Sequence, residues 1–264
     1  MPHAAIDRER LAADLPGAAA RNELVVYFQP QIEIGTGRVV AVEALSRWEH
    51  PALGTVMPDA YIPFAEQNGL MHEVGGSVLM DSCACIRDWA REGWNVEVAV
   101  NVAPVQLAGD RFFEDLDGVL GGASGSSVAD PSRLILEITE SDAIDDVDAV
   151  APRLDALRER GVTISIDDFG IGHSSVQRVV DLRATELKLD RDMVVRQATG
   201  VVAAAIDFAH GRGLRVVGEG VENESQLRML AELGCDRAQG YLIARPAPRA
   251  AFEGWARAAG LLGS

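Results

Sequence analysis

Short apolar runs alternate along this chain with longer segments whose apolar residues follow a helical period. Eight runs rich in β-branched residues predict strands, at residues 24–28, 38–45, 96–101, 134–139, 162–168, 186–190, 215–219 and 237–242. The segments between most of them predict helices, at residues 58–92, 104–120, 147–160, 174–181, 192–211 and 223–233. The first two strands adjoin across the turn Gly35-Thr36-Gly37, which favours a hairpin-like pair.

About eight strands, most of them followed by a helix, fit one domain within 264 residues. This alternation favours an α/β fold, a closed (β/α)8 barrel with an irregular start where two strands adjoin. An open doubly wound sheet is the alternative, and the lack of a Gly-x-Gly-x-x-Gly turn near the start disfavours it. Leu11 and Leu15 lie four apart in an alanine-rich segment, which predicts an amphipathic helix. We therefore expect a linker helix over residues 1–20 and the main domain over 21–264.

Composition narrows the class of protein. No apolar run approaches 18 residues, so we expect no membrane span in this chain, and no secretory signal opens it. Three cysteines, Cys83, Cys85 and Cys235, predict buried reduced thiols and a cytoplasmic protein. The net charge of −16 argues against a nucleic-acid polymer as partner, since that needs a basic surface. An anionic substrate would need bound cations to attract it.

Polar residues recur where the predicted strands end. The strand at 162–168 runs into Asp167-Asp168-Phe169-Gly170, a motif that by itself is typical of a turn. Other strands carry a carboxylate, an amide or a lysine at or near their ends, namely Glu43, Asn101, Glu137, Lys188, Glu219 and Gln239. The carboxyl ends of barrel strands converge on one face, so these side chains would meet there.

Carboxylates gathered in one place repel one another unless cations lie between them. Oxygen ligands favour Mg²⁺, Mn²⁺ or Ca²⁺ over zinc. Because Asp167 and Asp168 are adjacent, one of them could bridge two ions, and a pair of ions about 3.5–4 Å apart suits in-line attack at phosphorus.

Each residue also has a purely structural interpretation. Glu43 could be an edge-strand charge, Asn101 could cap the next helix, and Glu137 could form a surface ion pair. Lys188 faces away from the leucines on either side, either into the barrel or out to the helices. Polar residues on seven successive strands favour a shared site over independent structural roles.

With these residues in hand, the chain resembles the EAL domain family, named after the motif found here as Glu43-Ala44-Leu45. The resemblance runs from Tyr27 to Tyr241 and includes the motifs Val100-Asn101-Val102, Leu136-Glu-Ile-Thr-Glu-Ser141, Ile166-Asp-Asp-Phe-Gly170, Leu187-Lys-Leu-Asp-Arg191 and Gly218-Glu-Gly-Val-Glu222. It implies a modified TIM barrel with an antiparallel first strand. It also implies hydrolysis of the bacterial second messenger cyclic di-GMP to linear pGpG with two Mg²⁺ or Mn²⁺ ions, Ca²⁺ substituting or inhibiting.

The resemblance implies a role for each polar residue. One metal would be held by Glu43, Asn101, Glu137 and Asp167, and the second by Asp167, Asp168 and Glu219. Glu43, Lys188 and Glu219 form the implied catalytic set, with Lys188 contacting the nucleophilic water.

Four further residues are implied to bind substrate. Arg47 would bind a phosphate, and Gln29 and Leu45 would line the nucleotide groove. Gln239 would contact the metal-bound waters or the lysine. Glu140 matches the acid that anchors the loop 169–175, and this loop would couple metal binding to dimerisation.

The chain departs from the family pattern at positions that are not ligands. Ala103 and Gly218 stand where serine and alanine are common. Ile171 and His173 stand where threonine and tyrosine are usual, which affects regulation and dimer coupling more than chemistry.

Three hypotheses follow. The first is an active cyclic di-GMP phosphodiesterase, which the complete ligand set favours. The second is a catalytically silent receptor, and the third is an output domain regulated by a partner. The resemblance also implies a homodimer and an upstream sensor or GGDEF domain, with tethering to the inner membrane through a region outside this sequence left open.

Overall fold

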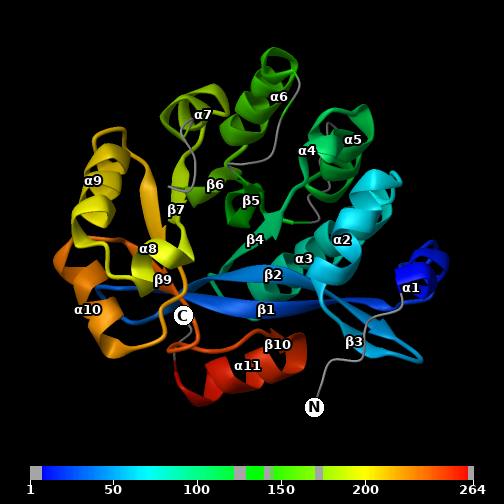
Figure 1. Cartoon of the computed structure of the whole chain (residues 1–264), viewed down its shortest axis with the longest axis horizontal. Helices are drawn as coiled ribbons and strands as arrows, with labels where there is room; N and C mark the ends of the chain where they lie inside the picture. The colour runs from blue at the N-terminus through cyan, green and yellow to red at the C-terminus, as the bar shows by residue number, and fades with distance from the viewer. Residues whose placement is uncertain (1–7, 122–128, 140–143, 145, 170–174, 261–264) are drawn as a thin grey trace.

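The computed structural model describes residues 8–121, 129–139, 144, 146–169 and 175–260. Eight strands close a barrel (Figure 1): β1 (Leu24–Glu33), β2 (Val39–His50), β4 (Glu97–Asn101), β5 (Leu134–Thr139), β6 (Thr163–Phe169), β7 (Glu186–Leu189), β8 (Arg215–Gly218) and β9 (Arg237–Gln239). Successive strands from β2 to β9 pair in parallel, and β1 closes the ring antiparallel to both β2 and β9. The predicted fold, a modified (β/α)8 barrel with an antiparallel first strand, is confirmed.

The helices surround this barrel. They are α1 (Arg8–Asp14), α2 (Pro58–Gln67), α3 (Met71–Arg91), α4 (Pro104–Leu107), α5 (Asp110–Val119), α6 (Val147–Glu159), α7 (Ser175–Asp181), α8 (Arg191–Val195), α9 (Thr199–His210), α10 (Glu224–Glu232) and α11 (Arg249–Ala258), with a 3-10 turn at Pro131–Arg133. Three predicted helices are each split into two. Gly69 and Gln197 explain two of the breaks, because both have φ in the left-handed region, at 69° and 49°, which no α-helix continues through.

The helix α11 was missing from the sequence-based prediction, as were the short strands β3 (Gly54–Val56) and β10 (Ala247–Pro248). Because β1 and β2 adjoin without a helix between them, the outer face of β1 needs a cover from elsewhere. Figure 1 shows α11 lying beside β1, and Phe252 of α11 packs against Phe28 of β1 and Trp89 of α3. The C-terminal helix thus replaces the helix that the hairpin lacks.

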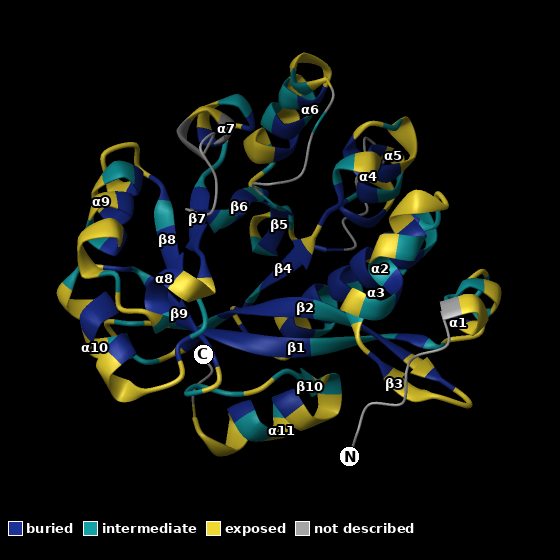
Figure 2. Cartoon of the chain, in the orientation of Figure 1, coloured by how far each residue is buried: buried dark blue, intermediate teal, exposed yellow. Residues whose placement is uncertain are grey.

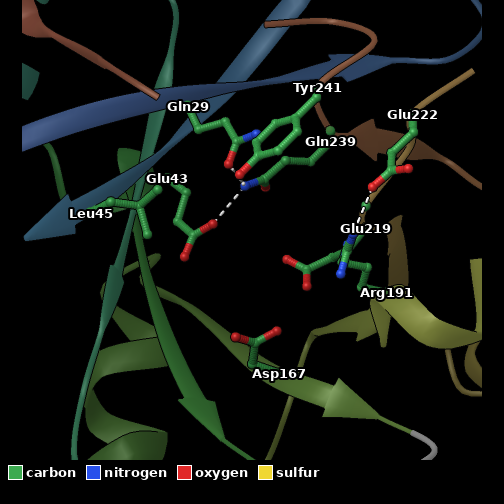
Figure 3. Close-up of a pocket in the computed structure, with 11 residues that line it drawn as sticks. Gln29, Glu43, Leu45, Asp167, Arg191, Glu219, Glu222, Gln239 and Tyr241 are labelled. Atoms are coloured by element: carbon green, nitrogen blue, oxygen red, sulfur yellow. Dashed lines mark hydrogen bonds and ion pairs between the residues drawn. The ribbon is translucent and has the colours of Figure 1, made fainter. Parts of the chain in front are cut away.

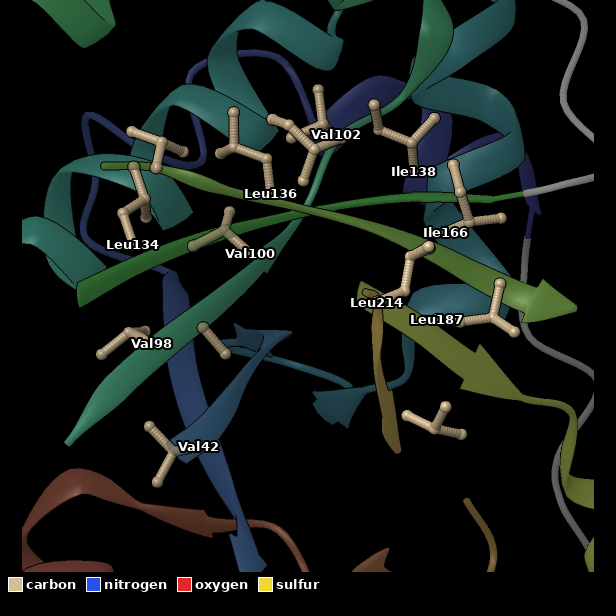
Figure 4. Packing of buried hydrophobic residues seen from close by; sticks show 14 of the residues in the cluster. Val42, Val98, Val100, Val102, Leu134, Leu136, Ile138, Ile166, Leu187 and Leu214 are labelled. Carbon is tan, nitrogen blue, oxygen red and sulfur yellow. The ribbon is translucent and has the colours of Figure 1, made fainter. Parts of the chain in front are cut away.

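The main hydrophobic core lies between the strands and the helices. Alternate residues of the strands point outward into it, among them Val98, Val100, Leu134, Leu136 and Ile166 (Figure 4). The buried faces of the helices complete it, while their outer faces are exposed (Figure 2). The residues between these positions point into the barrel, where they stack in layers.

A small apolar layer and an ionic layer fill the lower barrel. Ala41, Ala99 and Ile135 form the apolar layer. Below it, the fully buried Glu186 accepts from Arg215, with Nε to Oε2 at 2.5 Å, and Glu97 pairs with both Arg215 and Arg237. Two acids and two arginines therefore balance in charge at this end of the barrel.

The N-terminal segment packs on the edge of the barrel. Leu11 and Leu15 are buried in a second cluster with Trp48 and Tyr61. Asp14 pairs with the buried His50 of β2 across 3.0 Å. The helix itself spans Arg8–Asp14. Among the described residues, no helix combines the length and apolar character that crossing a membrane requires.

The buried ionic layer gives a stability prediction. Glu186→Ala removes one of the two acids that Arg215 and Arg237 share inside the barrel and leaves both arginines to Glu97. Removing one partner of a buried ionic group typically costs about 3–5 kcal/mol, so the free energy of unfolding should fall by about that much. Urea titration measures it, with Asp192→Asn, which breaks an exposed pair with Arg196, as control. A loss of under about 1 kcal/mol, as expected for the control, would contradict this account.

Candidate metal centre and substrate cavity

A buried lysine lies at the centre of the carboxyl end of the barrel. Its Nζ lies 2.7 Å from Glu219 Oε1, 3.0 Å from Glu137 Oε1, 3.2 Å from Asp167 Oδ1 and 3.9 Å from Glu43 Oε2. The lysine is Lys188 of β7, and it is fully buried. Leu187 and Leu189 on either side point outward into the core, so alternation directs Lys188 inward. Of the two orientations that the sequence left open, the structure shows the inward one, and it brings four of the predicted carboxylates together.

Amide side chains hold the carboxylate of Glu43. Asn101 Nδ2 donates to Oε1 at 2.9 Å and Gln239 Nε2 donates to Oε2 at 2.6 Å. Gln239 also donates to Gln29 Oε1 at 3.1 Å and accepts from Gln31 at 2.9 Å, which ties β9 to the antiparallel strand β1. The helix-cap interpretation of Asn101 is wrong, because the residue that caps α4 is Ala103.

Asp167, Asp168 and Glu219 form a triad, each with one oxygen within 4.8 Å of those of the other two. In a regular strand, consecutive side chains point to opposite faces. Asp168 has φ of 58°, in the left-handed region, and the ladder between β6 and β7 is interrupted between Ile166 and Phe169. This local twist turns both aspartates toward the site, so the backbone carries strain at the place where the two carboxylates are needed together.

Burial and mutual repulsion disturb the pKa values of these groups. Burial raises the pKa of Glu219 to about 8 and that of Asp168 to about 6, and the charge of Asp167 adds to both shifts. Burial likewise raises the pKa of Glu137 well above its ordinary value. These shifts show that the site holds more carboxylates than its own cation can neutralise.

The pKa values of Lys188 and Glu43 shift in the directions that favour their charged forms. Burial lowers the pKa of Lys188, but the surrounding carboxylates, Asp167 first, outweigh it and raise the pKa well above its ordinary value. Burial acts to raise the pKa of Glu43, yet Lys188 and the two amide donors lower it overall. An ammonium paired with an ionised glutamate therefore persists at neutral pH.

The donor set fits a hard divalent cation. Five carboxylates and one carboxamide supply oxygens only, which suits Mg²⁺, Mn²⁺ or Ca²⁺. Glu137 is fully buried, and among the described residues its Oε2 has no hydrogen-bond partner. A buried carboxylate oxygen without a partner is costly, and a cation would satisfy it. The Asp167, Asp168 and Glu219 triad can bind such an ion.

A cavity of about 200 Å³ opens beside this cluster (Figure 3). Its lining comes from β1 and β2, from the ends of β6 and β9, from the start of α8 after β7, and from the segments that follow β8 and β9. The lining residues are Gln29, Glu43, Leu45, Asp167, Arg191, Glu219, Gly220, Glu222, Gln239, Gly240 and Tyr241. Leu45 also lines a second, more apolar cavity of about 240 Å³ that reaches Asn101 and Ala103. The two cavities flank β2, the strand that carries the Glu-Ala-Leu motif.

Sequence reasoning assigned no role to Arg191, Glu222 or Tyr241, although Arg191 and Glu222 end quoted motifs and Tyr241 ends the resemblance. Their position at the cavity depends on how the loops after β7, β8 and β9 fold over the strand ends. The glycine at 218, where alanine is frequent, has a packing reason. A Cβ there would lie 2.4 Å from Leu230 Cδ1, so the glycine lets α10 pack closely on β8.

Arg47 shares the inward face of β2 with Glu43 but lines neither cavity. It is 7% exposed, donates to the carbonyl of Ser46 at 2.6 Å, and lies over the ring of Tyr27 at 5.5 Å. Glu140 and the loop positions 171 and 173 lie outside the described residues, so the anchoring role of Glu140 stays a prediction.

Comparison with known proteins identifies the class. The family model of the EAL domain matches residues 12–246, and the chain belongs to the EAL domain family. It is 39% identical over 247 residues to the bifunctional diguanylate cyclase/cyclic di-GMP phosphodiesterase MucR of Pseudomonas aeruginosa, covering 90% of this chain and 35% of MucR. It is 33% identical to the oxygen sensor protein DosP of Escherichia coli, covering 94% of this chain and 31% of DosP.

Solved structures agree with this assignment. The MucR phosphodiesterase in complex with c-di-GMP superposes with a TM-score of 0.84 at 38% identity, covering 92% of this chain and 99% of that one. The EAL domain of Mycobacterium smegmatis DcpA superposes with a TM-score of 0.71 at 31% identity, covering 89% and 96%. The chain spans about a third of the length of MucR and DosP.

The raised pKa values predict how a metal changes stability with pH. Without metal, Glu219 and Asp168 have folded-state pKa values of about 8 and about 6, above their ordinary 4.5 and 3.8. Each carboxyl therefore makes its full contribution to folding stability below its ordinary pKa. That contribution is lost as the pH rises through about 6 for Asp168 and about 8 for Glu219. A cation binds the ionised forms, so the rise in Tm that Mn²⁺ causes should be larger near pH 8 than near pH 5.

Differential scanning calorimetry in EDTA and in excess Mn²⁺ measures this difference. Replacing the titrating acid with Glu219→Gln should flatten the pH dependence, which makes this variant the control. An equal shift in Tm at both pH values in the unaltered protein would show that these carboxyls do not bind the cation.

Proposed function

We propose that this chain hydrolyses cyclic di-GMP to linear pGpG with the help of two divalent cations. The observation that carries the proposal is the cluster of four carboxylates around the buried Lys188, with Asp168 beside it, at the mouth of the barrel. This cluster borders a cavity in a member of a family whose relative MucR is described as a cyclic di-GMP phosphodiesterase.

We expect the two cations to share overlapping ligand sets, of which the structure supports the set around Asp167, Asp168 and Glu219. Glu43, Asn101, Glu137 and Asp167 would hold one ion, and Asp167, Asp168 and Glu219 the other, with Asp167 shared. Mg²⁺ or Mn²⁺, when bound, would lower the pKa of a water and offset charge on the phosphoryl oxygens. The partnerless oxygen of Glu137 and the strained turn at Asp168 support the presence of a cation at this cluster.

Lys188 is the proposed partner of the attacking water. Because its pKa is raised, its ammonium keeps all its protons and acts as a hydrogen-bond donor and a fixed positive charge. It can therefore orient the water and stabilise negative charge as the water loses its proton. The carboxylates of Glu43 and Glu219 fix the ammonium in place. The water gives up one proton to solvent, and its oxygen bonds to phosphorus in line as the bond to the 3′ oxygen breaks. The 3′ oxygen takes up a proton from solvent and leaves as a hydroxyl, which opens the ring to a linear product.

The cavity supplies the proposed nucleotide groove. Gln29, Leu45 and Gln239 line it, in keeping with their predicted roles in substrate binding. Arg47 stays a proposed phosphate contact, and reaching a phosphate would require it to leave the carbonyl of Ser46.

The larger assembly is also a matter of proposal. MucR carries a diguanylate cyclase activity besides its phosphodiesterase activity, and the chain covers 35% of it. We propose that this domain acts as a homodimer within a longer signalling protein that has an upstream sensor or GGDEF domain.

Product analysis tests the central proposal. Incubation with cyclic di-GMP and Mg²⁺ or Mn²⁺, followed by chromatography, should yield pGpG, and EDTA should abolish it because the carboxylates would lose their cations. Tight nucleotide binding without product would instead make the chain a silent receptor. Neither binding nor product would refute both interpretations.

A single substitution on β2 tests the ligand assignment. Glu43→Gln keeps the shape of the side chain but removes the negative charge that would hold a cation, so kcat should fall at least about 100-fold while the protein stays folded. Glu49→Gln changes the same charge at the exposed far end of the same strand and should leave kcat unchanged. Steady-state kinetics and circular dichroism make the comparison. Equal rates for the two variants would remove Glu43 from the site.

A further inference from the structure

One positively charged side chain lies in the lining of an otherwise acidic cavity. Among the described residues that line the cavity, four are acidic, namely Glu43, Asp167, Glu219 and Glu222. Arg191 is the single basic residue in the same lining. In a chain with a net charge of −16, this arginine supplies a positive charge within the lining that can attract an anionic ligand.

The backbone is shaped to place this side chain. Arg191 begins α8 directly after β7, and its Nη2 reaches Glu222 Oε1 at 2.6 Å, in the loop after β8. Between them lies Gly220, with φ of 65°. A Cβ on Gly220 would lie 2.2 Å from Arg191 Cγ. Only a glycine therefore lets the aliphatic part of the Arg191 side chain pass this close to the backbone. Figure 3 shows the guanidinium of Arg191 meeting the carboxylate of Glu222.

The ion pair with Glu222 is easily exchanged. The side chains of Arg191 and Glu222 are 60% and 40% exposed, and ion pairs exposed to that degree contribute little to stability. A guanidinium has five N–H donors in a fork that matches two phosphate oxygens, so it can release a carboxylate oxygen and bind a phosphodiester. Arg47, in contrast, is 7% exposed and already bonded to a carbonyl.

We propose that Arg191 binds the phosphodiester backbone of the nucleotide at the mouth of the cavity, in exchange for Glu222. This inference rests on the proposed function, because a cyclic dinucleotide carries two phosphodiesters. While one lies over the carboxylate cluster for attack, the other needs a cation elsewhere. Arg191 is a substrate-contacting residue that sets affinity for the dianion and takes no part in the chemical step.

Kinetics of Arg191→Met test the proposal. Losing one charge-assisted contact to phosphate should raise KM for cyclic di-GMP about tenfold or more, with kcat within about twofold. Arg191→Lys keeps the charge but loses the forked guanidinium, so its KM should lie between those of the unaltered protein and Arg191→Met. Added salt should raise KM of the unaltered protein more steeply than KM of Arg191→Met, because the variant has one contact fewer to screen.

Arg196→Met is the matched control. Arg196 follows α8 directly, carries the same charge and pairs with Asp192 at 2.9 Å on the exposed surface, but it does not line the cavity. It should behave as the unaltered protein does. If Arg191→Met matched Arg196→Met, or lowered kcat with KM unchanged, the proposed contact would be wrong.

The unaltered protein separates this inference from the proposed function. If it binds cyclic di-GMP without hydrolysing it, the same comparison is made on Kd by calorimetry, with the same tenfold change expected. If it neither binds nor hydrolyses the nucleotide, the proposed function fails, and the role of Arg191 fails with it.

Discussion

The attraction between one buried ammonium and the carboxylates around it organises the upper half of this barrel. Lys188 touches acids from four different strands, so each strand must end at the right height and in the right register for the contacts to form. An ammonium buried alone would be very costly, and so would the carboxylates. Each makes the burial of the other possible, and the surplus of acid is what a divalent cation would neutralise.

The antiparallel strand β1 extends this arrangement through hydrogen bonds of a neutral kind. Gln239 of β9 accepts a hydrogen bond from Gln31 of β1 and donates to Gln29 of β1. Gln239 also donates to Glu43. The amides fix a carboxylate without adding charge, so the electrostatic balance at Lys188 is left to the acids alone. Closing the barrel with a hairpin exposes the outer face of β1, and α11 covers that face with Phe252. The antiparallel start of the barrel therefore depends on the C-terminal helix, which buries the apolar face that the hairpin leaves uncovered.

The interior of the barrel separates stability from chemistry. Its lower end holds a balanced ionic group around Glu186, and a layer of Ala41, Ala99 and Ile135 lies above it. The balanced group has as many arginines as acids. The upper group has many acids and one lysine, and it opens to a cavity. A charge imbalance is tolerable only where ions and water can enter, which places the reactive layer at the mouth and the structural layer at the closed end.

The sequence by itself determined the alternation of strands and helices, the closed barrel and the polar residues that meet at its mouth, because side-chain periodicity and strand ends are local properties. Only the tertiary structure decided that Lys188 points inward, since alternation gives two faces and barrel closure chooses between them. It also decided the turn at Asp168, where a left-handed φ brings neighbouring carboxylates together. Arg191 at the start of α8 reaches Glu222 in the loop after β8, 31 positions away, and α11 covers a distant strand. Contacts of this kind arise from the packing of separate elements, which no local pattern records.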